Sequence, residues 1–121
     1  MLFRSIKNLA KEGPCVIVGR CADYALSDFH NVVNIFITGN EDDKIARIRA
    51  RFADLTSDEK ARDMMVKKDK QRRSYYNYYS SKKWGHCESY DLTINSSVLG
   101  IEDTVNFIVD FVNRFETGKR N

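Results

Sequence analysis

The sequence predicts an α/β fold, with a parallel sheet flanked by helices, in a single domain over residues 1–121. Short apolar runs at 15–18, 32–38 and 92–94 are rich in β-branched residues, which is typical of strands buried on both faces. Segments with helical spacing separate these runs, and strands that alternate with helices pair in parallel through right-handed crossovers. A chain of 121 residues with 42% hydrophobic content is sufficient for one packed domain.

Three helices are predicted in the first half of the chain. Apolar residues recur at helical spacing from Leu2 to Ala10, and Gly13-Pro14 ends that helix. A short helix is expected over 22–27. After the second strand, Asn40 can cap a third helix with an acidic first turn. The inner stripe of this third helix is expected to be Ile45, Ile48 and Phe52.

Two more helices are predicted in the second half. Thr56-Ser-Asp-Glu59 has the pattern of a capping box, and the helix that it starts is expected to run past Met65 into a tyrosine-rich stretch. The final helix has an apolar stripe of Ile101, Val105, Ile108, Val112 and Phe115.

Composition excludes several classes of protein. The net charge of +3 comes from 20 basic and 17 acidic residues, a balance that does not by itself favour nucleic acid. Three cysteines without a C-x-x-C motif indicate a reducing cytosol rather than a disulfide framework. His30 and His86 have no partner at ligand spacing, so no metal site is predicted. No apolar run approaches the thickness of a bilayer.

Arg20 and Asp23 follow the first predicted strand, where open α/β sheets bind ligands. The planar guanidinium of Arg20 can hold a phosphate, and Asp23 can accept hydrogen bonds from an amino group or orient Arg20. The competing interpretation is an Arg–Asp pair that only organises a turn.

Residues 67–84 combine seven basic side chains and one acid, Asp69, with four tyrosines and Trp84. Basic and aromatic groups together can bind nucleic acid, or they can form a mobile lid over nucleotide phosphates. A solvated helix face above packed tyrosines explains the same pattern. Lys44, Arg47 and Arg51 leave a similar choice, because arginines at 47 and 51 share a helix face that either reaches a phosphoryl group or only adds solubility.

Four segments together resemble the cytidylate kinase-like family of P-loop kinases. They are GPCVIVGRCADYAL at 13–26, DKQRRSYYNYY at 69–79, KKWG at 82–85 and YDLTINSSVLGIED at 90–103. The resemblance implies a three-layer P-loop-kinase-like fold with a basic lid over 67–84. It also implies ATP with Mg²⁺ as the phosphoryl donor and CMP or dCMP as the acceptor.

The same resemblance assigns roles to particular residues. Arg20 and Asp23 match the acceptor-nucleotide motif, and Arg72 with Asp69 and Lys70 matches the lid motif that neutralises the transferring phosphates. Phosphate-binding or donor-binding roles fall to the arginine-bearing helix and to the loop after the last strand, at Arg47, Arg51, Asn95 and Ser97.

The chain departs from the family at its amino end, because no G-x-x-x-x-G-K-[ST] motif is present. The resemblance therefore implies a fold truncated at the N-terminus that lacks the phosphate-binding loop and the strand before it. Three functions follow as alternatives: a kinase or an inactive fragment of one, a non-catalytic nucleotide-binding module, or a nucleic-acid-binding module. Because strand edges would be left unpaired, we also expect a homo-oligomer.

Overall fold

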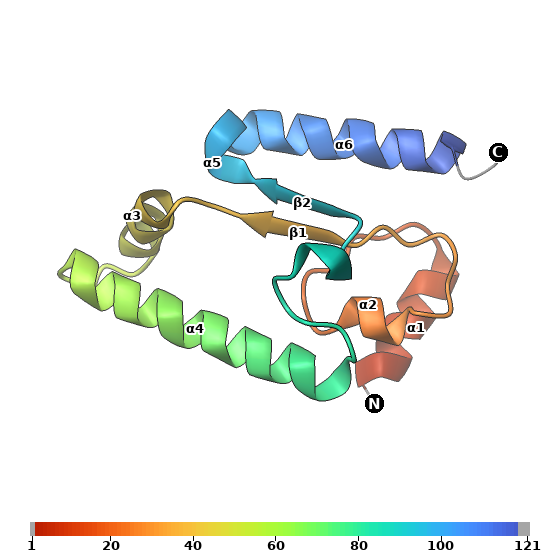
Figure 1. Ribbon diagram of the computed structural model, residues 1–121, viewed down its shortest axis with the longest axis horizontal. Coiled ribbons are helices and arrows are strands. Elements are labelled where there is room, and N and C mark those ends of the chain that lie inside the picture. The colour runs from red at the N-terminus through yellow and green to blue at the C-terminus, as the bar shows by residue number, and fades with distance from the viewer. Residues whose placement is uncertain (1, 119–121) are drawn as a thin grey trace.

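The structure, a computed structural model, describes residues 2–118 and contains a small parallel sheet surrounded by helices (Figure 1). The strands β1 (Ile35–Thr38) and β2 (Leu92–Asn95) pair in parallel, with Ile35 opposite Leu92 and Thr38 opposite Asn95. The crossover between them contains α3 (Glu41–Arg51), α4 (Asp58–Tyr79) and the short 3₁₀ turn η1 (Cys87–Ser89). This order confirms the α/β class that the alternating pattern predicts.

The remaining helices lie at the two ends of the chain. The helices α1 (Leu2–Glu12) and α2 (Ala22–Ala25) pack together beside the sheet, and α5 (Ser96–Leu99) leads from β2 into α6 (Ile101–Gly118). Figure 1 shows α6 running back along β2, while α4 spans the opposite side of the molecule. The described helices include none that is both long and apolar enough to cross a bilayer.

The buried core is small and divided between two places. Ile6, Ala25 and Leu26 form one cluster, against which Phe3, Ile17 and other apolar side chains pack. A second contact joins α3 to α4, where Ile45 is buried and Ala61 has no exposed surface. A complete absence of exposure at Ala61 means that the two helices approach closely there, which fixes the position of α4 relative to α3.

The prediction of a strand at 15–18 is wrong. These residues form no strand, and their backbone groups make no hydrogen bond within residues 2–118. Val16 is 93% exposed and Val18 is 87% exposed. A strand needs a neighbouring backbone to bond with, and none of the described residues supplies one here.

Several element boundaries also differ from the predictions. The second strand begins at Ile35 rather than at 32, the short helix ends at Ala25 rather than at 27, and Phe52 lies just beyond α3. The cap of α4 is Ser57, not Thr56, and its hydroxyl accepts a hydrogen bond from the Lys60 amide at 3.2 Å. The α6 stripe is only partly covered, because Ile101 and Val105 are exposed.

Candidate functional site

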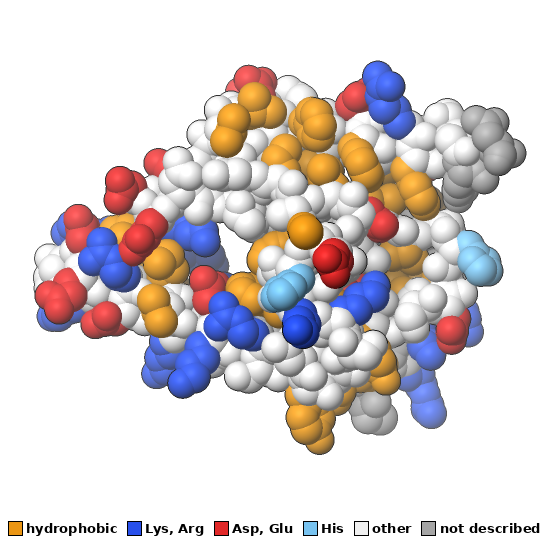
Figure 2. Space-filling model, viewed as in Figure 1, with side chains coloured by type: hydrophobic (Ala, Val, Ile, Leu, Met, Phe, Trp, Pro, Cys, Tyr) orange, Lys and Arg blue, Asp and Glu red, His pale blue; other side chains and the backbone are white. Residues whose placement is uncertain are grey.

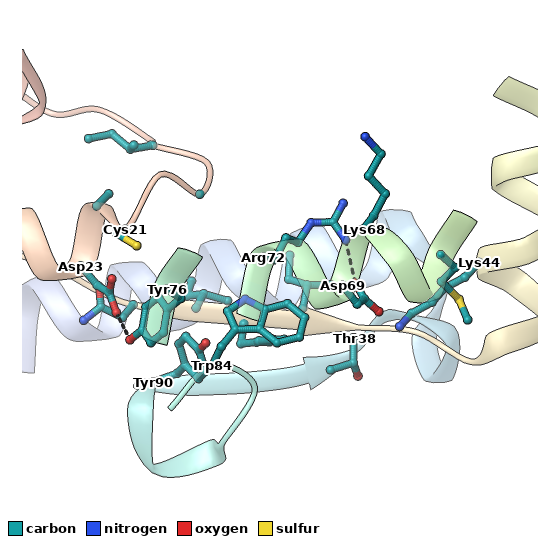
Figure 3. Close-up of a pocket in the computed structure, with 18 of the residues that line it drawn as sticks. Cys21, Asp23, Thr38, Lys44, Lys68, Asp69, Arg72, Tyr76, Trp84 and Tyr90 are labelled. Atoms are coloured by element: carbon teal, nitrogen blue, oxygen red, sulfur yellow. Dashed lines mark hydrogen bonds and ion pairs between the residues drawn. The ribbon is translucent and has the colours of Figure 1, made fainter. Parts of the chain in front are cut away.

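A large cleft of about 840 Å³ lies between β1, the turn before α2, and the facing sides of α3 and α4. Figure 2 shows the molecule hollowed beside the basic side chains of the α3–α4 region. Cations gather toward one end of this cleft and aromatic side chains toward the other, as the close-up in Figure 3 makes clear.

The basic end is built from two helices that present cations at helical spacing. Lys44, Arg47 and Arg51 come from α3, and Lys68 and Arg72 from α4. The only carboxylates among the residues lining the cleft are Asp23 and Asp69, and Asp69 accepts a hydrogen bond from Arg72 at 2.7 Å. The excess of positive charge makes this end suitable for binding an anion.

Most cations that line the cleft differ in ion pairing from two arginines on the outer sides of the same helices. Arg49 of α3 pairs with Asp58 at 2.8 Å, and Arg62 of α4 pairs with Glu41. In contrast, Lys44, Arg47 and Lys68 pair with no carboxylate in residues 2–118. These two arginines outside the cleft are neutralised locally, whereas four of the five cations that line it, the three above and Arg51, form no ion pair within the described chain and are left for a bound anion.

The aromatic end is held together by edge-on ring contacts. The centroid of Phe36 on β1 lies 5.1 Å from that of Trp84 and 4.8 Å from that of Tyr90. The Trp84 amide donates to Asn77 Oδ1 at 3.0 Å, and the Arg73 guanidinium lies over the indole at 5.4 Å. These contacts fix Trp84, the single tryptophan of the chain, at the wall of the cleft.

Asp23 connects α2 with α4. The Tyr76 hydroxyl donates to Asp23 Oδ2 at 2.5 Å, and Asp23 Oδ1 accepts from the Tyr24 amide at 2.8 Å. Burial and this hydrogen bond raise the pKa of Tyr76 well above its ordinary value. Asp23 therefore orients Tyr76, and within residues 2–118 it makes no ion pair with Arg20.

Arg20 faces a second hollow of about 500 Å³ that adjoins the cleft. The turn that carries it is strained, because Arg20 and Cys21 both have positive φ, of 63° and 53°. Arg72, Tyr76 and Trp84 line both hollows and form the partition between them. Of the two residues of the predicted motif, Arg20 therefore lines the second hollow and Asp23 lines the cleft.

Some of the other predicted site residues line the cleft, and the rest lie outside it. Asp69, Arg72, Arg47 and Arg51 line the cleft, whereas Lys70 is exposed and does not. Asn95 and Ser97 also lie outside it, where they join the end of β2 to the loop after β1. Asn95 Nδ2 donates to Asn40 Oδ1 at 3.0 Å, and Ser97 Oγ accepts from the Asn40 amide at 2.8 Å.

Sequence reasoning gave no role to Tyr90, and it placed Lys68 and Tyr76 in the cleft region only as members of the basic and aromatic stretch 67–84. One signal was available, because positions 68, 72 and 76 are spaced four apart and lie on one face of a helix. Tyr90 reaches the cleft only because residues 80–91 turn back toward β1, where the Asp91 amide donates to the Asn34 carbonyl at 2.8 Å. No local sequence pattern predicts that Tyr90 reaches the cleft.

Residues 1–98 match the cytidylate kinase-like family. The chain belongs to that family. The match covers most of the chain and contains every residue that lines the two hollows.

A crystal structure of an uncharacterized protein from Eubacterium ventriosum ATCC 27560 is similar to this cytidylate kinase-like chain, with a TM-score of 0.85 and 34% sequence identity. The alignment covers 92% of this chain and 62% of that one, so the chain spans less than two thirds of its neighbour's length. No protein of curated function matches it.

Proposed function

We propose that this chain binds nucleoside phosphates as the nucleotide-binding part of a cytidylate kinase-like phosphotransferase. The observation that carries the proposal is the polarity of the cleft, with unpaired cations at one end and aromatic side chains with a carboxylate at the other. A nucleotide has the complementary polarity, since its phosphates are anionic and its base is a planar ring with polar edges.

The proposed acceptor is CMP or dCMP. Each Asp23 oxygen accepts one hydrogen bond in the protein and retains a lone pair, which suits the exocyclic amino group of cytosine. Arg20 approaches from the second hollow, and Arg72 lies at the partition, where its planar fork can bind a phosphate. Lys44, Arg47, Arg51 and Lys68 would neutralise further phosphate charge.

ATP with Mg²⁺ is the proposed donor. Residues 2–118 contain no cluster of three or more His, Cys, Asp or Glu side chains that could hold a metal. Mg²⁺ is usually bound through one or two carboxylates together with substrate phosphates, so this chain fits a metal that arrives with the nucleotide. The bound metal would offset charge on the transferring phosphoryl group, and Arg72 would do the same from the protein.

A titration with CMP tests the proposal, with Trp84 fluorescence as the signal. We expect CMP to quench Trp84, since this residue lines both hollows. Replacing Arg20 by alanine should weaken binding roughly tenfold to a hundredfold, because a charge-assisted hydrogen bond contributes about 1.5–3 kcal/mol. Lys82→Ala, at an exposed position outside both hollows, should leave the affinity unchanged.

Two outcomes would contradict the proposal. One is equal loss of affinity in the two variants, and the other is the absence of CMP binding to the parent chain. Tight binding of an oligonucleotide that displaces CMP and weakens steeply with salt would instead favour the nucleic-acid alternative.

We also infer that the 121-residue chain does not turn over ATP at a normal kinase rate and associates with itself in a reducing cytosol. The sequence contains no phosphate-cradling loop, and Val16 and Val18 are almost fully exposed apolar side chains. Light scattering at micromolar concentration should report a mass above that of one chain, and a coupled ATP/CMP assay should stay at background. A monodisperse monomer would refute the self-association. Sustained CMP-dependent ATP turnover would refute the expected lack of kinase activity.

A further inference from the structure

The carboxylate of Asp23 is held at both oxygens by donors from different parts of the chain. Oδ1 accepts a hydrogen bond from the amide of the next residue, Tyr24, at 2.8 Å, and Oδ2 accepts from the Tyr76 hydroxyl at 2.5 Å. The last torsion of an aspartate side chain has broad minima, so the plane of this carboxylate is set by its donors rather than by its own rotamer. Of the two donors, only Tyr76 comes from another element, α4.

Tyr76 is itself fixed in place. It is buried, and its ring centroid lies 6.4 Å from that of Tyr90, whose hydroxyl accepts from the Gly85 amide at 3.1 Å. The Tyr76 carbonyl also accepts from the Ser80 amide at 2.9 Å, the bond that closes the last turn of α4. Figure 3 shows the hydroxyl of this constrained side chain meeting Asp23 at the aromatic end of the cleft.

A carboxylate in a fixed position can distinguish the two pyrimidine bases. Cytosine carries an exocyclic amino group, which donates, where uracil carries a carbonyl, which only accepts. A carboxylate accepts and does not donate, so it binds the amino group and repels the carbonyl. Uracil does have a donor, the ring N–H beside that carbonyl, but a carboxylate placed for the amino group must turn to reach it. A carboxylate that cannot turn therefore favours cytosine, and one that turns freely accepts from either base.

We propose that Tyr76 is a positioning residue that determines base selectivity. It holds Asp23 where the carboxylate accepts from an exocyclic amino group and does not reach the ring N–H of uracil. This inference rests on the proposed function, because it requires the base to lie at the aromatic end of the cleft. It assigns the choice of base to a residue of α4, outside the motif that contains Arg20 and Asp23.

The experiment titrates CMP and UMP into the full 121-residue chain and compares the two affinities, with Trp84 fluorescence as the signal. We expect the parent chain to prefer CMP by roughly tenfold or more, since a site built to hydrogen-bond one group rejects an analogue without it. Tyr76→Phe should bind CMP more weakly and keep its affinity for UMP. The preference should then fall by roughly fivefold to tenfold, the effect of one hydrogen bond.

Two further variants separate selectivity from folding. Tyr78→Phe removes a hydroxyl from an exposed residue of the same helix, and it should keep the preference of the parent chain. Asp23→Glu keeps the charge but moves the carboxylate away from the position that Tyr76 fixes, so it should lose the preference. Asp23→Glu leaves Tyr76 in place and gives an answer even where Tyr76→Phe does not fold.

The ratio of the two affinities decides the outcome. A purely structural role for Tyr76 would lower the affinities for CMP and UMP alike, and that result in Tyr76→Phe would overturn the proposal. A preference for CMP that survives in Tyr76→Phe or in Asp23→Glu would overturn it as well. Equal binding of CMP and UMP to the parent chain would contradict this inference and leave the proposed function intact, whereas binding of neither nucleotide would contradict both.

Discussion

Replacing Arg72 by alanine is expected to lower the affinity of the chain for CMP by roughly tenfold to a hundredfold. Arg72 is the one basic residue that lines both the large cleft and the hollow beside Arg20. A phosphate in either hollow can therefore reach its guanidinium, and one charge-assisted contact contributes about 1.5–3 kcal/mol to binding. Removal of Arg72 also leaves Asp69 without its ion pair, and that carboxylate would repel a bound phosphate.

The planar fork of Arg72 and its charge can be separated by substitution. Arg72→Lys keeps the charge but loses bidentate geometry, so it should recover only part of the affinity. Asp69→Asn removes the local competitor for the guanidinium and should bind CMP at least as tightly as the parent chain.

Arg49→Ala is the matched control for Arg72. It removes a half-exposed arginine of the adjacent helix that is already paired, with Asp58, and that does not line the cleft. Titration of all four variants by Trp84 fluorescence separates the possibilities. Equal losses for Arg72→Ala and Arg49→Ala would mean that overall charge, not the cleft, attracts the nucleotide.

Local sequence signals explain why most helices could be predicted. The acidic first turn of α3, the serine that caps α4 and the apolar spacing of α6 each act within a few residues. Segment 15–18 shows where such signals fail. Its composition suits a strand, but pairing depends on backbone that lies far away in the sequence or outside the chain, and here none of the described residues provides it.

The candidate site likewise combines residues that could be assigned from the sequence with contacts that depend on distant parts of the chain. Arg72 and Asp69 were assigned through the resemblance of residues 69–79 to the family's lid motif, and in the structure they form an ion pair three residues apart on one helix. Asn95 and Ser97 were expected near a bound nucleotide, but their hydrogen bonds go to Asn40, more than fifty residues earlier in the chain. The orientation of Asp23 likewise depends on Tyr76, which no spacing rule connects to it.

Loss of the hydroxyl in Tyr76→Phe is expected to lower the free energy of unfolding by about 1.5–3 kcal/mol at pH 7, the range for a hydrogen bond to a charged group. Tyr76 is buried, and its hydrogen bond to Asp23 joins α2 to the last turn of α4. The variant leaves the Asp23 carboxylate without this donor in a half-buried position. Urea unfolding followed by circular dichroism measures the difference.

The same pair predicts how stability depends on pH. Because the folded protein holds the Tyr76 proton more tightly than the unfolded chain, the contribution of Tyr76 is fully present below the ordinary tyrosine pKa of about 10. It is lost progressively as the pH rises above that value, when the unfolded chain ionises first. Burial also raises the pKa of Tyr90, which should add to the same loss.

The variant and the parent chain should therefore converge in alkaline solution. Tyr76→Phe should begin less stable at pH 7 but lose less of its free energy of unfolding between pH 9 and 11, since it has no hydroxyl to ionise at that position. Tyr78→Phe is the control, because Tyr78 lies on the same helix but is 81% exposed, and its removal should alter neither value. Parallel pH profiles for the parent chain and Tyr76→Phe would show that the hydroxyl of Tyr76 does not hold α4 against α2.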